Sequence, residues 1–288
     1  MPTVIRYVLG GRLGNRMFEI MLAYSLARRL GDCLVTGEAL PEWEIAPRRR
    51  TLPPRHLKLG GHRIDIGRLR YLLDHGLIEG IETTALGCRM ELLDPLDTVR
   101  TLFRAPGPPV KGYGADTLVI NVRADEILGA RHKDYRPLPL AFFARLIAQT
   151  GLRPVFLGQI GEDRYSDALR ARFPLAEFVP SCGPMADFET LRASCHICVA
   201  VSTFSWLAAW LSHAQSIHLP LAGMLHPRQR ADVDLLPLTD PRYHFHLLPH
   251  GDWKGTEAEL AEVIGGEEAG QDLSRDAALQ LVQTNVVL

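Results

Sequence analysis

The sequence predicts an α/β protein with a doubly wound parallel sheet in its C-terminal half. Between residues 117 and 219, apolar segments of strand length alternate with longer segments of helical periodicity. Near the N-terminus, the apolar segment Thr3–Leu9 leads through a glycine-rich corner into a second helical pattern that ends at Gly31. A proline- and glycine-rich segment at 105–109 lies between the two halves and predicts a domain boundary.

The N-terminal half begins as a strand, a turn and a helix, and is less regular afterwards. Residues 41–63 are rich in proline, arginine and glycine and favour no element, whereas 64–75 and 94–103 are typical of helices. The helical face after the corner is indicated by apolar residues at helical spacing, namely Leu13, Met17, Ile20, Met21, Tyr24 and Ala27. This half is expected to be an α/β domain over residues 1–110.

The C-terminal half follows a regular order. Strands are predicted at 117–122, 154–157, 177–179, 197–201 and 216–219, and helices at 140–150, 163–173, 186–194 and 204–213. Two more helices are predicted at 256–264 and 273–283. We therefore expect a Rossmann-like domain over 111–245, with a helical tail over 246–288 that packs back onto the protein.

Composition and charge exclude several classes of function. The 288 residues contain 47% hydrophobic residues, and 32 lysines and arginines balance 33 acidic residues, so no global field favours nucleic acid or a polybasic membrane contact. Arginines are concentrated in the first third, which indicates either a solvated basic face or a surface that meets an anionic ligand or lipid headgroup. Peripheral membrane contact therefore stays open, and nothing in the sequence indicates an oligomeric state.

The cysteines and the apolar segments indicate a reduced, cytoplasmic setting, with the inner face of the membrane as one alternative. Five scattered cysteines fit free thiols better than disulfides. The Cys195–Cys198 spacing is expected to reflect packing, because no second cysteine pair completes a zinc site. The N-terminus lacks signal-peptide features, and the apolar segment 197–211 is too short to span a bilayer.

Three stretches have residue types suited to binding an anion. Gly10–Asn15 is a glycine corner that lets the backbone approach a ligand, or a tight turn without one. Arg123 follows an apolar strand, where it could hold a phosphate or pair with Asp125 or Glu126. Later in the chain, Ser202 or Thr203 is predicted to cap a helix whose N-terminus also suits an anion. Trp206 and Trp210 are expected to face the core, with an aromatic platform for a ligand as the alternative.

Together, these stretches resemble bacterial α1,2-fucosyltransferases and the superfamily that includes α1,6- and protein O-fucosyltransferases. The similarity lies in Gly-Gly-x-Leu-Gly-Asn at 10–15, an arginine at a strand exit, Asp-Phe-Glu-Thr-Leu at 187–191 and Ser-Thr-Phe-Ser-Trp at 202–206. The resemblance implies two facing Rossmann-like domains, the GT-B architecture. It also implies a metal-independent, inverting transfer of fucose from GDP-fucose to a glycan acceptor, in surface polysaccharide or glycolipid synthesis.

The resemblance also implies roles for individual residues. Arg123 would contact the donor diphosphate, Asp187 would read the guanine edge, and Asn121 would lie at the family's histidine position. The predicted donor-binding set is Gly11, Gly14, Asn15, Arg16, Asn121, Arg123, Asp187, Ser202, Thr203, Phe204 and Ser205, and the predicted catalytic set is Arg123, Glu126 and Asn15. No metal ligands and no cofactor besides the donor substrate are expected.

The sequence departs from the family pattern near Arg123. Ala124 occupies the position of a second arginine, and Arg16 stands where a glutamine is common. The general base stays open among four residues of the loop after the strand, namely Asp125, Glu126, His132 and Asp134. A nucleotide-sugar-binding protein without catalysis, a transferase that uses another nucleotide sugar, and an α/β protein with an unrelated ligand remain alternatives.

Overall fold

The computed structural model describes residues 2–47 and 49–284. The described chain forms two compact units. Unit 1 comprises the residues up to Pro108 together with Asp232–Leu235, and unit 2 comprises Pro109–Ala231 and the residues from Leu236 onward. Strand β10 (Tyr243–Leu247) contains position 245, so the expected border between a Rossmann-like domain and a tail falls inside a strand.

Unit 1 contains a parallel four-stranded sheet in the order β2-β1-β4-β3. The strands are β1 (Thr3–Tyr7), β2 (Cys33–Thr36), β3 (His56–Leu59) and β4 (Gly80–Thr83). Helix α1 (Leu13–Leu30) packs on β1 and β2 and also contacts α2 (Ile66–Asp74), while α3 (Leu96–Leu102) ends before the segment that leaves the unit. The strand and helix predicted at the N-terminus are therefore present, and Gly31 ends α1 as expected.

Unit 2 contains a seven-stranded sheet in the order β11-β10-β9-β8-β5-β6-β7. All neighbouring pairs are parallel except β10 with β11. The strands are β5 (Thr117–Val122), β6 (Arg153–Gly158), β7 (Glu177–Pro180), β8 (His196–Cys198), β9 (Ser216–Leu221), β10 and β11 (Gln271–Leu273). All six residues of β5 are buried, as expected for a central strand covered on both faces.

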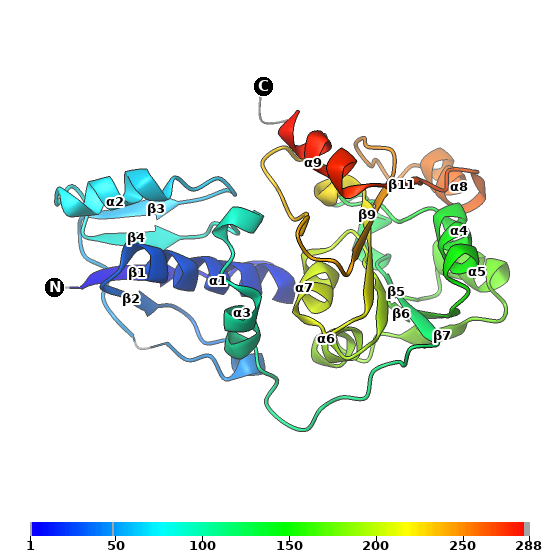
Figure 1. Ribbon diagram of the computed structural model, residues 1–288, viewed down its shortest axis with the longest axis horizontal. Coiled ribbons are helices and arrows are strands. Elements are labelled where there is room, and N and C mark those ends of the chain that lie inside the picture. Colours follow the sequence, from blue (N-terminus) through cyan, green and yellow to red (C-terminus); the bar gives the residue numbers. More distant parts are fainter. Residues whose placement is uncertain (1, 48, 285–288) are drawn as a thin grey trace. The chain divides into compact units, whose positions relative to one another are not determined.

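Helices cover both faces of this sheet (Figure 1). Figure 1 shows α4 (Leu140–Thr150), α5 (Arg164–Arg172) and α8 (Glu257–Gly265) on one side, and α6 (Pro184–Arg192) and α7 (Thr203–Leu211) on the other. Helix α9 (Arg275–Gln283) follows β11. Trp206 and Trp210 of α7 are buried, with stacked rings 5.4 Å apart, which confirms that both tryptophans face the core.

The structure confirms the α/β class and the parallel, Rossmann-like strands, and it adds elements that the sequence did not indicate. Strands β2, β3 and β4 complete the sheet of unit 1, with β3 inside the segment that favoured no element. The expected helical tail also contributes β11, which pairs with β10 along the edge of the larger sheet. Short edge strands with polar residues, such as Gln271–Leu273, give no clear period-2 pattern in a sequence.

Candidate functional site

Arg123 lies directly after β5, at the carboxyl edge of the sheet in unit 2. Its guanidinium donates to the carbonyl oxygen of Val201 at 3.1 Å and to the carboxylate of Glu126 at 2.9 Å. The same group lies over the ring of Tyr135, 4.4 Å from its centroid. Because Val201 immediately precedes the cap of α7, this hydrogen bond joins a fixed positive charge to the start of a helix.

Glu126 is held as an anion in this arrangement. Its second carboxylate oxygen accepts from Nε2 of Gln159 at 3.0 Å, and Oε1 of Gln159 accepts from the amide of Ala124. Burial raises the pKa of Glu126, but the hydrogen bond and charge of Arg123 outweigh it and lower the pKa to about 2. A carboxylate with this pKa is a weak proton acceptor near neutral pH, which favours a role in orienting Arg123 over a role as general base.

Asn121 lies on β5 beneath this pair and is buried. Its side-chain amide donates to the carbonyl oxygen of Leu157 at 3.1 Å, which ties β5 to β6. Asn121, Arg123 and Arg136 border a cavity of only about 10 Å³, room for no more than one water molecule. The protein side of the Arg123 guanidinium is therefore closely packed, and any ligand would have to approach the guanidinium from the solvent.

The start of α7 has the predicted cap. The hydroxyl of Ser202 accepts from the amide of Phe204 at 3.1 Å, which confirms Ser202 as the N-cap. Ser202 and Thr203 retain slight exposure, whereas Ser205 is fully buried and its hydroxyl donates to the carbonyl oxygen of Ala200. The side chain of Ser205 thus supports the turn from inside.

Asp187 lies in the first turn of α6 and is engaged by the turn that precedes the helix. Its carboxylate accepts from the hydroxyl of Ser181 at 2.5 Å and from the amide of Cys182 at 3.1 Å. Asp187 is 7% exposed. These contacts stabilise the connection between β7 and α6, so a ligand would have to share or replace the Ser181 hydroxyl in order to use the carboxylate.

In unit 1, the glycine corner follows β1 and leads into α1. Gly11 has a φ of 67°, and a Cβ there would lie 2.7 Å from the side-chain nitrogen of Asn15. The corner therefore needs glycine for both its backbone conformation and the side chain folded over it. Gly14 is buried on α1, and Arg16 pairs with Glu42 at 3.3 Å.

Glu19 was not among the predicted residues, although it lies under this corner. Its carboxylate accepts from the amide of Gly10 at 2.8 Å, and the residue is 4% exposed. Burial raises its pKa to about 7, with Glu38 adding to the rise while the Gly10 amide and Arg16 oppose it. The sequence does contain one signal for this residue: Glu19 is the only acidic residue in the otherwise apolar segment 17–23 of a predicted helix.

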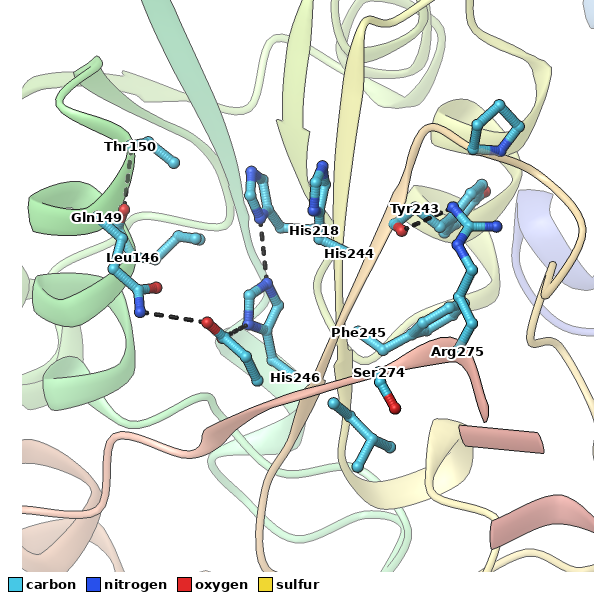
Figure 2. A pocket seen from close by; sticks show the side chains of 13 residues that line it. Leu146, Gln149, Thr150, His218, Tyr243, His244, Phe245, His246, Ser274 and Arg275 are labelled. Atoms are coloured by element: carbon cyan, nitrogen blue, oxygen red, sulfur yellow. Dashed lines mark hydrogen bonds and ion pairs between the residues drawn. The ribbon is translucent and has the colours of Figure 1, made fainter. Parts of the chain in front are cut away.

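A different pocket, of about 600 Å³, lies beside β9, β10 and β11 of unit 2 (Figure 2). Nδ1 of His246 lies 2.8 Å from the carboxylate of Asp272, and its Nε2 lies 3.1 Å from Nδ1 of His218. Figure 2 shows His218 and His244 side by side, with rings that stack at 5.0 Å. The sequence does not indicate this cluster, because its histidines become neighbours only through the pairing of β9 with β10.

The described residues contain neither a candidate metal site nor a helix that could span a membrane. No group of three or more histidine, cysteine, aspartate or glutamate residues suited to a metal ion occurs within 2–47 and 49–284. In the same part of the chain, no helix has both the length and the apolar character needed to cross a bilayer. The five cysteines, which include buried Cys88 and Cys198, are free thiols.

Comparison with known proteins gave distant structural matches only. No family model matches the chain, and no curated protein matches it. Among solved structures, it is similar to the dodecameric iron-containing heptosyltransferase TibC in complex with ADP-D-β-D-heptose, at 13% identity and a TM-score of 0.45 over 99% of this chain and 77% of that one. A crystal structure of TibC from enterotoxigenic E. coli H10407 matches at 12% identity and a TM-score of 0.42, over 95% of this chain and 67% of that one.

A third match is the E. coli ADP-heptose lipopolysaccharide heptosyltransferase II, at 10% identity and a TM-score of 0.43 over 99% of both chains. At this level of similarity, neither the activity nor the ligands of these proteins transfer to this chain.

Proposed function

We propose that the protein is an inverting, metal-independent glycosyltransferase. It would transfer a sugar from a nucleoside diphosphate sugar to a glycan acceptor. The observation that carries this proposal is the hydrogen bond between Arg123 and the carbonyl oxygen of Val201, 3.1 Å long, at the cap of α7. It joins a planar cation to a helix N-terminus at the carboxyl edge of a doubly wound sheet. Such edges bind nucleotides, and both groups favour phosphate.

The motif similarity to fucosyltransferases favours GDP-fucose as the donor. Arg123 and the first turn of α7 would stabilise the charge that grows on the departing GDP, without a metal ion. Asp187 would accept from the guanine ring N–H after its bond to Ser181 is exchanged. The transfer would be a single displacement in which an acceptor hydroxyl attacks the anomeric carbon, the bond to GDP breaks, and the hydroxyl proton passes to a base.

A general base works best with a pKa near the working pH, whereas the pKa of Glu126 is about 2. We therefore propose that the base is one of the other three residues of the loop after β5, namely Asp125, His132 and Asp134. The test replaces each of them in turn by asparagine. Loss of the base should abolish turnover while GDP binding persists.

Thermal-shift measurements with a panel of nucleotides test the donor. GDP and GDP-fucose should raise the melting temperature more than UDP, CMP and NAD counterparts, because a ligand at 100 times its Kd adds about 2.7 kcal/mol to the stability of the folded state. Transfer or slow hydrolysis of GDP-fucose should continue in excess EDTA. A larger shift with UDP-sugars would refute the choice of donor, and turnover that needs added Mg²⁺ or Mn²⁺ would refute metal independence.

A further inference from the structure

A second pocket, of about 680 Å³, opens at the carboxyl ends of β1 and β2 in unit 1. Ligands of parallel α/β sheets bind at this edge. The lining comes from three short segments, which contribute Arg6, Tyr7 and Val8, then Thr36, Gly37, Glu38 and Ala39, and finally Ala46, Pro47, Arg49 and Arg50.

The charges along this pocket are mostly positive. Arg6 is paired with Glu82, whereas Arg49 and Arg50 are exposed and make no ion pair within the described residues. Among the described residues that line the pocket, Glu38 is the only acidic one. Two guanidinium groups are therefore available to an anion, next to one carboxylate that can accept from hydroxyl groups.

The pocket has fixed walls. The hydroxyl of Tyr7 donates to the carbonyl oxygen of Glu38 at 2.6 Å, and a Cβ on Gly37 would lie 2.4 Å from the Tyr7 ring. The amide of Arg50 donates to the hydroxyl of buried Thr36 at 3.1 Å. This bond attaches the backbone of Arg50 to the end of β2, so the segment that carries the two arginines is tied to the sheet at the pocket.

We propose that this pocket binds an anionic sugar, whose carboxylate or phosphate group is held by Arg49 and Arg50. The volume suits a ligand of sugar size, and the mixture of two cations with Glu38 and a backbone edge suits a hydroxylated ring with one acidic substituent. The inference rests on the proposed function, under which this sugar is part of the acceptor. The acceptor of the transfer would then carry a negative charge.

The experiment compares three sugars that share one ring type: glucose, glucuronate and glucose 6-phosphate. Binding to the full-length protein is measured by ligand-observed NMR at low and at high salt. The test variant is Arg49→Ala/Arg50→Ala. The control is Arg68→Ala/Arg172→Ala, which removes two other exposed arginines and changes the net charge equally.

We expect glucuronate, glucose 6-phosphate or both to bind more tightly than glucose. The test variant should weaken that binding by roughly tenfold or more, since charge-assisted hydrogen bonds are lost, and salt should weaken it in the native protein. The two anionic sugars separate carboxylate from phosphate recognition. Equal binding of all three sugars, or an equal loss in the control variant, would overturn the proposal.

Two further measurements distinguish failure of the pocket proposal from failure of the proposed function. GDP should stabilise the test variant as much as the native protein, because neither Arg49 nor Arg50 is among the residues proposed to bind the donor. A native protein that binds GDP but no anionic sugar refutes only the pocket. Sedimentation with vesicles of phosphatidylglycerol tests the other possible partner of these arginines. Vesicle binding that depends on Arg49 and Arg50, without binding of anionic sugars, would assign them to a membrane surface and refute the proposal.

Discussion

Arg123 and Glu126 form an ion pair of 2.9 Å in which both side chains are largely buried. The pair combines the two alternatives that the sequence left open, since the arginine is a partner of a neighbouring acid and also lies at the edge where a phosphate would bind. A substitution of Arg123 should therefore lower both the stability of the fold and the turnover, through two different contacts.

Arg123→Ala should lower donor turnover on the order of a hundredfold, comparable to removing one donor of an oxyanion hole. It should also destabilise the protein by about 2 kcal/mol, because a buried carboxylate loses its cation. Arg123→Lys should recover only part of the turnover, since lysine lacks the planar fork.

The double variant Arg123→Ala/Glu126→Gln separates these effects. It should regain much of the lost stability without regaining turnover, as measured by denaturant unfolding and by GDP release on the same samples. A double variant with native turnover would remove Arg123 from the mechanism.

Substitutions at Asp187 and Ser181 distinguish a structural role of the Asp187 carboxylate from a role in binding GDP. Asp187→Asn keeps one oxygen for the Cys182 amide but can no longer act as a charged acceptor for guanine, so GDP affinity should fall. Ser181→Ala removes the competing hydroxyl and should leave GDP affinity equal or higher. Calorimetric titration of both variants with GDP checks this, and unchanged affinity in Asp187→Asn would show that the carboxylate serves only the turn.

The two units differ in how far the sequence could predict them. Unit 2 was predicted well, because its helices and central strands have clear periods and its caps, such as Ser202, have the expected chemistry. Strands β2, β3 and β4 were missed because four residues are too few to show a clear period, and most residues of β2 and β3 are only half-buried.

The sequence predicts where the residues of the site lie along the backbone better than it predicts the contacts of their side chains. Arg123 and Ser202 follow from their positions at strand and helix ends, but the partners that decide their chemistry come from elsewhere. Gln159 reaches Glu126 from the end of β6, 33 residues away. Glu19 acquires its raised pKa through burial, which depends on packing that one sequence does not display.

Gly37 should be required at the wall of the pocket in unit 1. Its φ is not in the left-handed region, so the limit is space: an added Cβ would lie 2.4 Å from the Tyr7 ring. Gly37→Ala should cost about 1–3 kcal/mol through overpacking and should weaken binding of the anionic sugar. Gly60→Ala is the matched control, since nothing lies within 4 Å of that Cβ. Equal unfolding midpoints in the two variants would contradict the close approach.

The histidines beside β10 should make stability depend on pH. Burial lowers the pKa of His218 to about 3 and that of His246 to about 4, with neighbouring histidines adding to both shifts, while Asp272 opposes them. His244 and His196 also face His218, and Arg145 faces His246. Because the carboxylate of Asp272 can only accept, Nδ1–H of His246 donates to it, and neutral His246 then accepts from His218.

The folded state therefore binds fewer protons than the unfolded chain, whose histidines titrate near pH 6.5. The stabilisation is complete above about pH 6.5 and is lost as the pH falls toward 4 and 3. Each histidine in this window contributes a slope of at most about 1.4 kcal/mol per pH unit. Glu19 acts in the opposite direction, because its raised pKa of about 7 favours the folded state as the pH falls from 7 to 4.5.

Comparison of variants isolates the histidine contribution from that of Glu19. His218→Asn should lower stability at pH 7.5 but reduce the loss between pH 6.5 and 4.5, because one buried proton acceptor is gone. The control variant His75→Asn changes an exposed histidine at the C-terminal cap of α2, outside the cluster of buried histidines. Free energies of unfolding in urea at half-unit pH steps provide the measurement. If the native protein and His218→Asn lose stability in parallel below pH 6.5, the buried histidines are not the groups that destabilise the fold in acid.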